Sequence, residues 1–157
     1  MTHDMRYYTL DVTRRLLREG APVKGTSPEK VTGYAMDNCF DPGSLYRESA
    51  FLVFLDKNGN IRGHFLLGTG GISAVTMDVR LACLALLESG CRNAVLLHNH
   101  PEGNPRPSQG DIKVTENLKK AFNTLDCCLA DHVIIGDGCI FSFSLEKVIP
   151  YTGTQAA

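Results

Sequence analysis

The stretch AVLLHNHPEGNPRPSQGD, residues 94–111, combines an apolar run, two histidines, three prolines and two acids. Its apolar start predicts a short strand that runs directly into His98, and the prolines predict a rigid loop. Because strand side chains alternate, His98 and His100 project to the same side. Ser108 then opens a helix whose first turn holds Asp111. Two nitrogens and one oxygen, with a fourth position left open, predict a catalytic type of zinc site at His98, His100 and Asp111.

Plainer interpretations remain open for parts of this stretch. Ser-x-x-Asp before a helical run is often a helix cap, with Ser108 accepting from an amide and Asp111 favoured by the helix dipole. The two histidines could also form a solvated loop pair. The letters His-Asn-His mimic HNH nucleases, but those spread their histidines over tens of residues and this chain lacks a basic charge. The combination of strand end, rigid loop and acid-bearing helix start favours the metal site.

Before this stretch the sequence predicts a hairpin and a helix. Residues 51–55 and 61–67 are apolar runs around the turn signal Asn58-Gly59, which is typical of an antiparallel pair. Ser27-Pro28-Glu29 is a usual helix opening and predicts a helix to about Asn38. Nearer the N-terminus a strand is indicated by the alternation of Tyr8, Leu10 and Val12.

Two longer helices are predicted around the histidine strand. The first covers residues 78–89, ends at Gly90, and turns inward Val79, Ala82, Cys83, Leu86 and Leu87. The second covers residues 108–125 and turns inward Ile112, Leu118, Phe122 and Leu125. Strands at 129–135 and 139–143 close the domain. This order predicts a single α/β (α+β) domain with a mixed sheet flanked by helices.

Composition narrows the class of protein. The 157 residues fit one domain, and Lys+Arg 16 against Asp+Glu 17 gives a net charge of -1, so there is no strong signal for nucleic-acid binding. No apolar window reaches the length of roughly 18 residues that a membrane span needs, and the start lacks a secretory pattern. None of the six cysteines forms a C-x-x-C pair. We therefore expect a soluble, cytoplasmic protein with buried, reduced thiols and no membrane partner.

The array His-x-His-x7-Ser-x2-Asp at residues 98–111 resembles the signature of the JAMM (JAB, MPN) metalloprotease superfamily. The proline-rich loop resembles its bacterial RadC-like branch in particular. The resemblance covers residues 45–150, leaving 1–44 as an N-terminal extension of strand and helix and 151–157 as a tail. The helix-hairpin-helix region of long RadC proteins is expected to be absent. Further agreements are Arg47-Glu48, Gly68-Thr69-Gly70, Arg80, Thr115 and Asp131-His132-Val133-Ile134-Ile135.

The resemblance implies a JAB/MPN fold of cytidine-deaminase-like architecture with one zinc ion per chain. It implies that Glu48, which alone would be interpreted as a solvated acid, is the general base, and that Ser108 donates to the oxyanion. Asp131 and His132 would support the metal site or make a sheet hydrogen bond. The sequence departs from the family at Asn99, Glu102 and Gly110. Deubiquitinating relatives carry Ser or Thr at the position of Asn99.

The implied function is a zinc-dependent hydrolase that cleaves an amide or isopeptide bond in a protein or peptide. The alternative is a non-catalytic RadC-like interaction module, connected with DNA repair or mobile elements through the label of its relatives. Glu48 favours the enzyme, because a scaffold needs no general base. Residues 68–71 fit a turn better than a phosphate-binding loop, and His3 and His64 are expected at the surface. The oligomeric state is left open.

Overall fold

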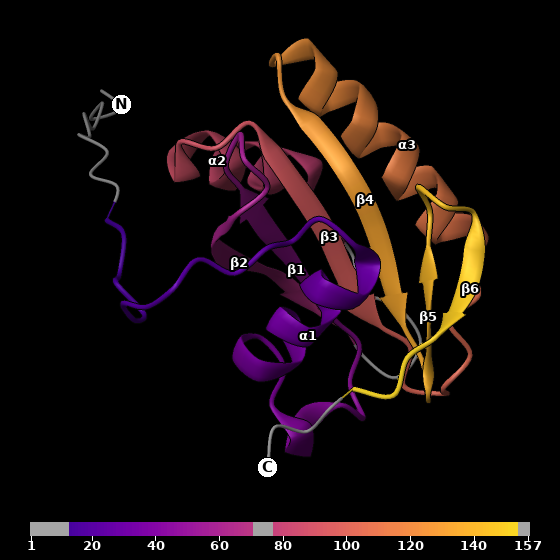
Figure 1. Cartoon of the computed structure of the whole chain (residues 1–157). Helices are drawn as coiled ribbons and strands as arrows, with labels where there is room; N and C mark the ends of the chain where they lie inside the picture. The colour runs from indigo at the N-terminus through magenta and orange to yellow at the C-terminus, as the bar shows by residue number, and fades with distance from the viewer. Residues whose placement is uncertain (1–12, 71–76, 154–157) are drawn as a thin grey trace, which may run out of the picture.

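A computed structural model describes residues 13–70 and 77–153 (Figure 1). Helix α1 is preceded by an extended segment, and strands and helices follow it. In chain order they are α1 (Pro28–Asn38), the 3-10 helix η1 (Pro42–Ser44), β1 (Ser49–Leu55), β2 (Ile61–Thr69), α2 (Val79–Ser89), β3 (Asn93–Asn99), α3 (Gln109–Thr124), β4 (Cys128–Ile135), β5 (Cys139–Ser142) and β6 (Lys147–Pro150).

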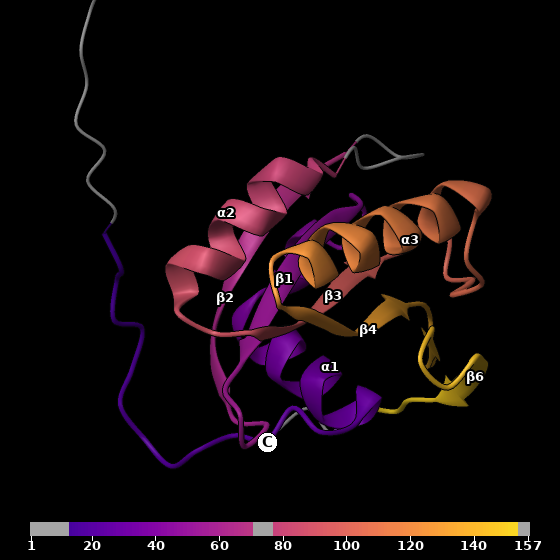
Figure 2. The same ribbon diagram turned by 90° about the horizontal axis from the view of Figure 1, so that it is seen from above.

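The six strands form one mixed sheet in the order β2-β1-β3-β4-β5-β6. The pair β3–β4 is parallel and is connected through α3, whereas the other neighbouring strands are antiparallel. Helices α2 and α3 cover one face of the sheet and α1 covers the other, as Figure 2 shows. The predicted single α/β domain with a mixed sheet is therefore confirmed.

Strands β1 and β3 lie in the middle of the molecule and are buried along nearly their whole length. Alternate residues enter two apolar clusters, one on each face of the sheet. Leu52 and Leu96 belong to the cluster under α2 and α3, and Val53 and Leu97 belong to the cluster under α1. A strand buried on both faces is typical of the centre of a sheet. The end of β3 is thus a firm platform for His98.

The predicted hairpin and the limits of α2 are confirmed. Asp78 caps α2, and Gly90 ends it with a left-handed φ of 71°, a conformation that glycine adopts without strain. The turn expected from residue 68 begins later than predicted, because β2 continues to Thr69. Strand β6 was not predicted, since it is four residues long and mostly exposed. The strand expected around residue 10 and the last residue of the expected turn, Gly71, lie outside the described residues.

The inward faces of the helices differ in part from the prediction. Leu87 of α2 is 52% exposed, and Ile112 and Leu125 of the α3 region are 36% and 37% exposed. The buried residues of α3 are instead Asp111, Thr115, Leu118 and Phe122. Two polar side chains occupy the face that a purely apolar pattern assigns to hydrophobic residues. Helix α3 is therefore rotated to bring these polar groups toward the end of β3.

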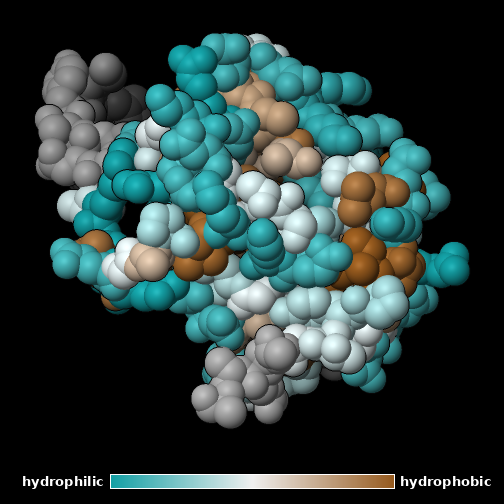
Figure 3. All heavy atoms as spheres, in the orientation of Figure 1, coloured by the Kyte–Doolittle hydropathy of each residue, from teal (hydrophilic) through white to brown (hydrophobic). Residues whose placement is uncertain are grey.

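Side chains near the other face also correct two expectations. His64 is half-buried and its Nδ1 lies 3.0 Å from the Tyr34 hydroxyl of α1, so its assignment to the surface is wrong. All six cysteines are free, but Cys127 alone is buried and Cys128 is exposed. Figure 3 shows separate apolar patches on the face seen in Figure 1, one of them over β5 and β6, where Val148 is exposed. Within the described residues, no helix has the length and apolar character needed to span a membrane.

Candidate metal centre

Four polar side chains meet at the end of β3. The Nε2 atoms of His98 and His100 lie 3.0 Å apart, because both rings leave the strand on the same side. Asp111 places Oδ1 3.2 Å from His98 Nε2 and Oδ2 3.4 Å from His100 Nε2. Glu48 Oε1 lies 3.6 Å from His98 Nε2. One ligand atom from each of these four residues lies within 4.8 Å of the others, so this metal cluster could hold an ion.

The loop between His100 and α3 is fixed to the β4–β5 turn. The His100 amide donates to the Ile135 carbonyl at 2.8 Å, and the Asp137 amide donates to the Gly103 carbonyl at 2.8 Å. A Cβ atom on Gly136 would lie 2.4 Å from the Gly103 oxygen, so only glycine permits this close approach. These contacts return the chain to the sheet, and α3 begins beside the histidines.

Ser108 and Asp111 form a capping box at the start of α3. The Ser108 hydroxyl accepts from the Asp111 amide at 3.1 Å and donates to Asp111 Oδ2 at 2.8 Å, while the Ser108 amide donates to the same oxygen at 2.7 Å. The predicted cap is confirmed. The cap and the metal cluster are not exclusive alternatives, because the capping bonds also turn Asp111 Oδ1 toward His98.

Asn99 holds the segment that carries Glu48. Its side chain leaves β3 on the side opposite the histidines and is buried. Its Nδ2 donates to the carbonyls of Leu45 and Arg47 at 3.0 and 2.9 Å, and its Oδ1 accepts from the Ser49 amide at 2.8 Å. Sequence reasoning noted Asn99 only as a departure from the family. Its position between the two histidines was the one available signal for this role.

A second group of polar contacts supports the histidines from behind. His100 Nδ1 lies 2.8 Å from the Asn104 carbonyl. His98 Nδ1 lies 2.8 Å from His132 Nε2, and His132 Nδ1 lies 2.6 Å from the Thr115 hydroxyl. Asp131 is directed elsewhere, since its carboxylate accepts from the residues of the β5 end, Ser142 and Ser144. Of the pair Asp131-His132, His132 contacts the cluster and Asp131 holds the sheet.

The electrostatics of the cluster favour a positive charge between its members. Burial raises the pKa of Glu48. Burial alone would also raise the pKa of Asp111, but hydrogen bonds with His100 and His98 lower it well below its usual range. Burial would lower the pKa of His100, yet contacts with Asp111 and Asn104 raise it. A proton on His100 balances the negative charge of these carboxylates, and a divalent cation would also balance it.

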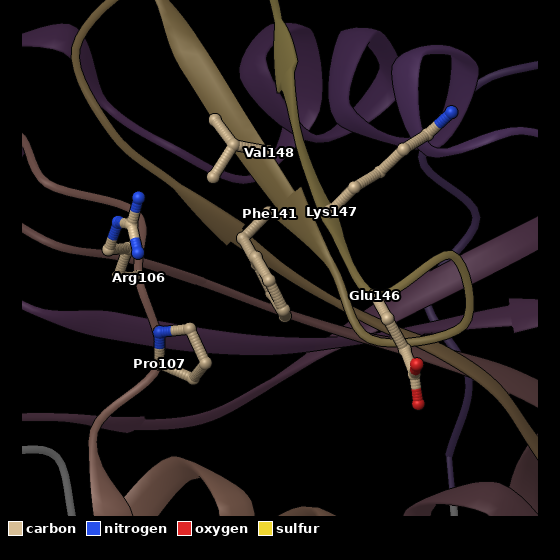
Figure 4. A pocket seen from close by; sticks show the side chains of 6 residues that line it. All are labelled: Arg106, Pro107, Phe141, Glu146, Lys147 and Val148. Carbon is tan, nitrogen blue, oxygen red and sulfur yellow. The ribbon is translucent and has the colours of Figure 1, made fainter.

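A pocket of about 500 Å³ lies beside the loop and next to Ser108 in the chain. Figure 4 shows Phe141 in its centre, with Arg106 and Pro107 from the loop on one side and Lys147 directed away from them. Phe141 contacts Phe143 edge-on, with ring centroids 5.2 Å apart, and Phe143 stacks on His132 at 4.6 Å. The pocket is therefore connected to the metal cluster by continuous aromatic packing.

The fold and the cluster define a mixed α/β domain with a candidate metal centre. A model described as "RadC-like JAB domain" matches residues 25–148, a range that includes α1. The chain belongs to the RadC-like JAB domain family.

Three relatives carry names that begin with "UPF0758 protein". The one from Flavobacterium johnsoniae is 37% identical over 106 residues, or 68% of this chain and 46% of the relative. The one from Porphyromonas gingivalis is 32% identical over 141 residues, 89% of this chain and 62% of the relative. The one from Caldanaerobacter subterraneus is 33% identical over 131 residues, which are 82% of this chain and 55% of the relative. The chain thus spans about half the length of these relatives, whose names state no activity.

Proposed function

We propose that this protein is a zinc-dependent hydrolase that cleaves an amide or isopeptide bond in a protein or peptide. The observation that carries the proposal is the cluster of two imidazole nitrogens and two carboxylates within 4.8 Å of one another. A cytoplasmic location is part of the proposal and is supported by the free state of all six cysteines.

The donor set fits zinc. His98, His100 and Asp111 offer two nitrogens and one oxygen, the composition of catalytic zinc sites with an open fourth position. Zinc also binds nitrogen and oxygen ligands more strongly than divalent iron or manganese does. A bound zinc ion would supply Lewis acidity, polarising the carbonyl of the substrate and making water nucleophilic at neutral pH.

Glu48 is the proposed general base. It would accept a proton from the attacking water and deliver it to the leaving amine. Its location suits this role, because its carboxylate is buried next to His98 and is held through the backbone segment that Asn99 fixes. The raised pKa of Glu48 also suits a group that must both take up and release a proton.

Ser108 is the proposed donor to the oxyanion that forms on the substrate carbonyl. In the structure its hydroxyl donates to Asp111 Oδ2. A rotation about the Cα–Cβ bond of Ser108 would direct this hydrogen to the substrate, because the Ser108 amide also donates to the same oxygen and keeps Asp111 in place. Asp111 would then hold its position during the reaction.

The test compares three variants for zinc content and for hydrolysis. Glu48→Gln should retain zinc and lose about 10²–10⁴-fold in rate, since an amide cannot accept the proton. Asp111→Ala should lose zinc. The matched control is Glu116→Gln, an acid on the exposed side of α3, which should keep both properties. Substrates are sought among peptides with amide or isopeptide bonds and in lysate, by comparing wild type with Glu48→Gln.

A substrate that the wild type and Glu48→Gln cleave equally well would eliminate Glu48 as the base. A chain that binds zinc and cleaves nothing, while both proteins capture the same partner, would favour the non-catalytic interaction module.

A further inference from the structure

We infer that Thr115, acting through His132, is a positioning residue that determines which ring nitrogen of His98 faces the metal cluster. The inference rests on the metal site of the proposed function and adds to it a specific source of metal affinity. Its starting point is the row of short contacts from Asp111 through Thr115 and His132 to His98.

The first step locates the proton of Thr115. Its Oγ1 lies 2.6 Å from the main-chain carbonyl of Asp111, and a carbonyl can only accept. The single hydroxyl proton therefore points at Asp111. Oγ1 also lies 2.6 Å from His132 Nδ1, and with its own proton engaged it must accept from that nitrogen. His132 consequently carries a hydrogen on Nδ1.

The second step concerns the other nitrogen of His132. The ring is fully buried, and among the described residues no carboxylate bonds to it, because that of Asp131 bonds to Ser142, Ser144 and the His132 amide. A fully buried imidazole without a carboxylate partner is neutral. With Nδ1 protonated, Nε2 is then an acceptor, and His98 Nδ1 donates to it at 2.8 Å.

The third step is the consequence for the cluster. With a hydrogen on Nδ1, His98 has its Nε2 available as the ligand atom for an ion that lies among Asp111, Glu48 and His100. This is the tautomer that a metal ligand needs. With the opposite tautomer of His132, its Nε2 would donate, His98 would hold its hydrogen on Nε2, and that hydrogen would occupy the position of the ion.

The two ligand histidines differ in how their tautomers are set. His100 Nδ1 donates directly to the Asn104 carbonyl, and because a carbonyl can only accept, this contact fixes a hydrogen on Nδ1 of His100. His98 donates to an imidazole, which can be donor or acceptor at the same atom, so a further group must decide between the two. Thr115 is that group. Phe143 stacks on the His132 ring with an angle of 2° between the planes and holds its orientation, but its amide donates to the His132 carbonyl and not to a ring nitrogen.

The experiment reads the tautomers directly. Long-range ¹H–¹⁵N correlation spectra of the imidazoles are recorded on metal-free protein, and zinc affinity is measured by competition with a chelator. The wild type should show His98 and His132 with hydrogen on Nδ1. Thr115→Val should populate the other tautomer and weaken zinc binding about 10–100-fold. Thr115→Ser should restore both results, because it keeps the hydroxyl.

The matched control is Thr32→Val. Thr32 is also buried in a helix and its hydroxyl makes the same kind of bond, to the Pro28 carbonyl at 2.7 Å, but it contacts no histidine in the described structure. This variant should bind zinc as the wild type does.

Two results would overturn the inference: a wild-type His98 without a hydrogen on Nδ1, or Thr115→Val with unchanged zinc affinity. The wild-type spectrum tests the tautomer assignment even if Thr115→Val fails to fold. Failure of the proposed function is distinguishable, because it would appear as zinc-loaded wild type without Glu48-dependent cleavage and would leave the tautomers unchanged.

Discussion

Asn99 offers a direct test of how Glu48, the proposed general base, is positioned. Replacing it with alanine removes three hydrogen bonds of 2.8–3.0 Å from a buried place: those to Leu45, Arg47 and Ser49. A hydrogen bond contributes a net 0.5–1.5 kcal/mol, so the free energy of unfolding should fall by roughly 1.5–4.5 kcal/mol. Asn99→Asp should be at least as destabilising, because its carboxylate faces two carbonyl oxygens.

The effect of Asn99→Ala on activity and on zinc affinity should separate the proposed base from the proposed metal ligands. His98 belongs to β3, whose pairing with β1 and β4 remains in the variant, and His100 follows β3 directly and donates its amide to the Ile135 carbonyl of β4. Glu48, in contrast, precedes β1 and depends on the segment that Asn99 fixes. Asn99→Ala should therefore retain zinc affinity and lose kcat. The measurements are urea unfolding, chelator competition and steady-state kinetics on a substrate found with the wild type.

The control is Asn38→Ala at the end of α1. Among the described residues, the Asn38 side chain makes one hydrogen bond, to the Tyr34 carbonyl at 2.8 Å, and Asn38 is far from β3 in sequence. Its replacement should cost about 0.5–1.5 kcal/mol and leave kcat unchanged. The reasoning about Asn99 is refuted if Asn99→Ala unfolds within about 0.5 kcal/mol of the wild type, or if it weakens zinc binding as much as it lowers kcat.

Three further outcomes are expected. Ser108→Ala should lower stability by about 1 kcal/mol in urea unfolding, through loss of the cap, and hydrolysis about 10²–10³-fold. The pKa of His100 is raised in the fold, so protonated His100 stabilises the metal-free protein at pH values below the ordinary pKa of histidine. This stabilisation is lost as the pH rises through the raised pKa. The gain in Tm on adding zinc should therefore be larger near about pH 8 than near about pH 6. Gly136→Ala should destabilise by about 1–3 kcal/mol and weaken zinc binding by displacing the Gly103 loop, whereas Gly110→Ala, with its nearest contact at 3.5 Å, should do neither.

The parts of the site that depend on local spacing could be predicted from the sequence. His98 and His100 share a side because they are two residues apart on a strand, and Asp111 lies in the first turn of a helix with recognisable start signals. These relations hold in any fold that keeps the strand and the helix. The sequence resemblance added Glu48, which is 50 residues from His98 and whose own surroundings give no sign of a role.

The supporting contacts depend on pairings that the sequence does not display. Thr115 and His132 are 17 residues apart and meet because α3 crosses from β3 to its parallel neighbour β4. An apolar residue every three to four positions would place Ile112 and Leu125 on the inward face of α3. The polar contacts of Asp111 and Thr115 compete with that period and determine the rotation of the helix instead.

The burial of β3 on both faces has a practical consequence for anyone purifying this protein. Small zinc domains such as zinc fingers unfold when the ion is removed, because the ion replaces a core. Here two apolar clusters hold the strand that carries the histidines, and neither cluster includes a member of the metal cluster. A sample stripped by a chelating resin would keep its circular dichroism spectrum and its elution volume. Its metal content has to be measured before a failed assay is counted against catalysis.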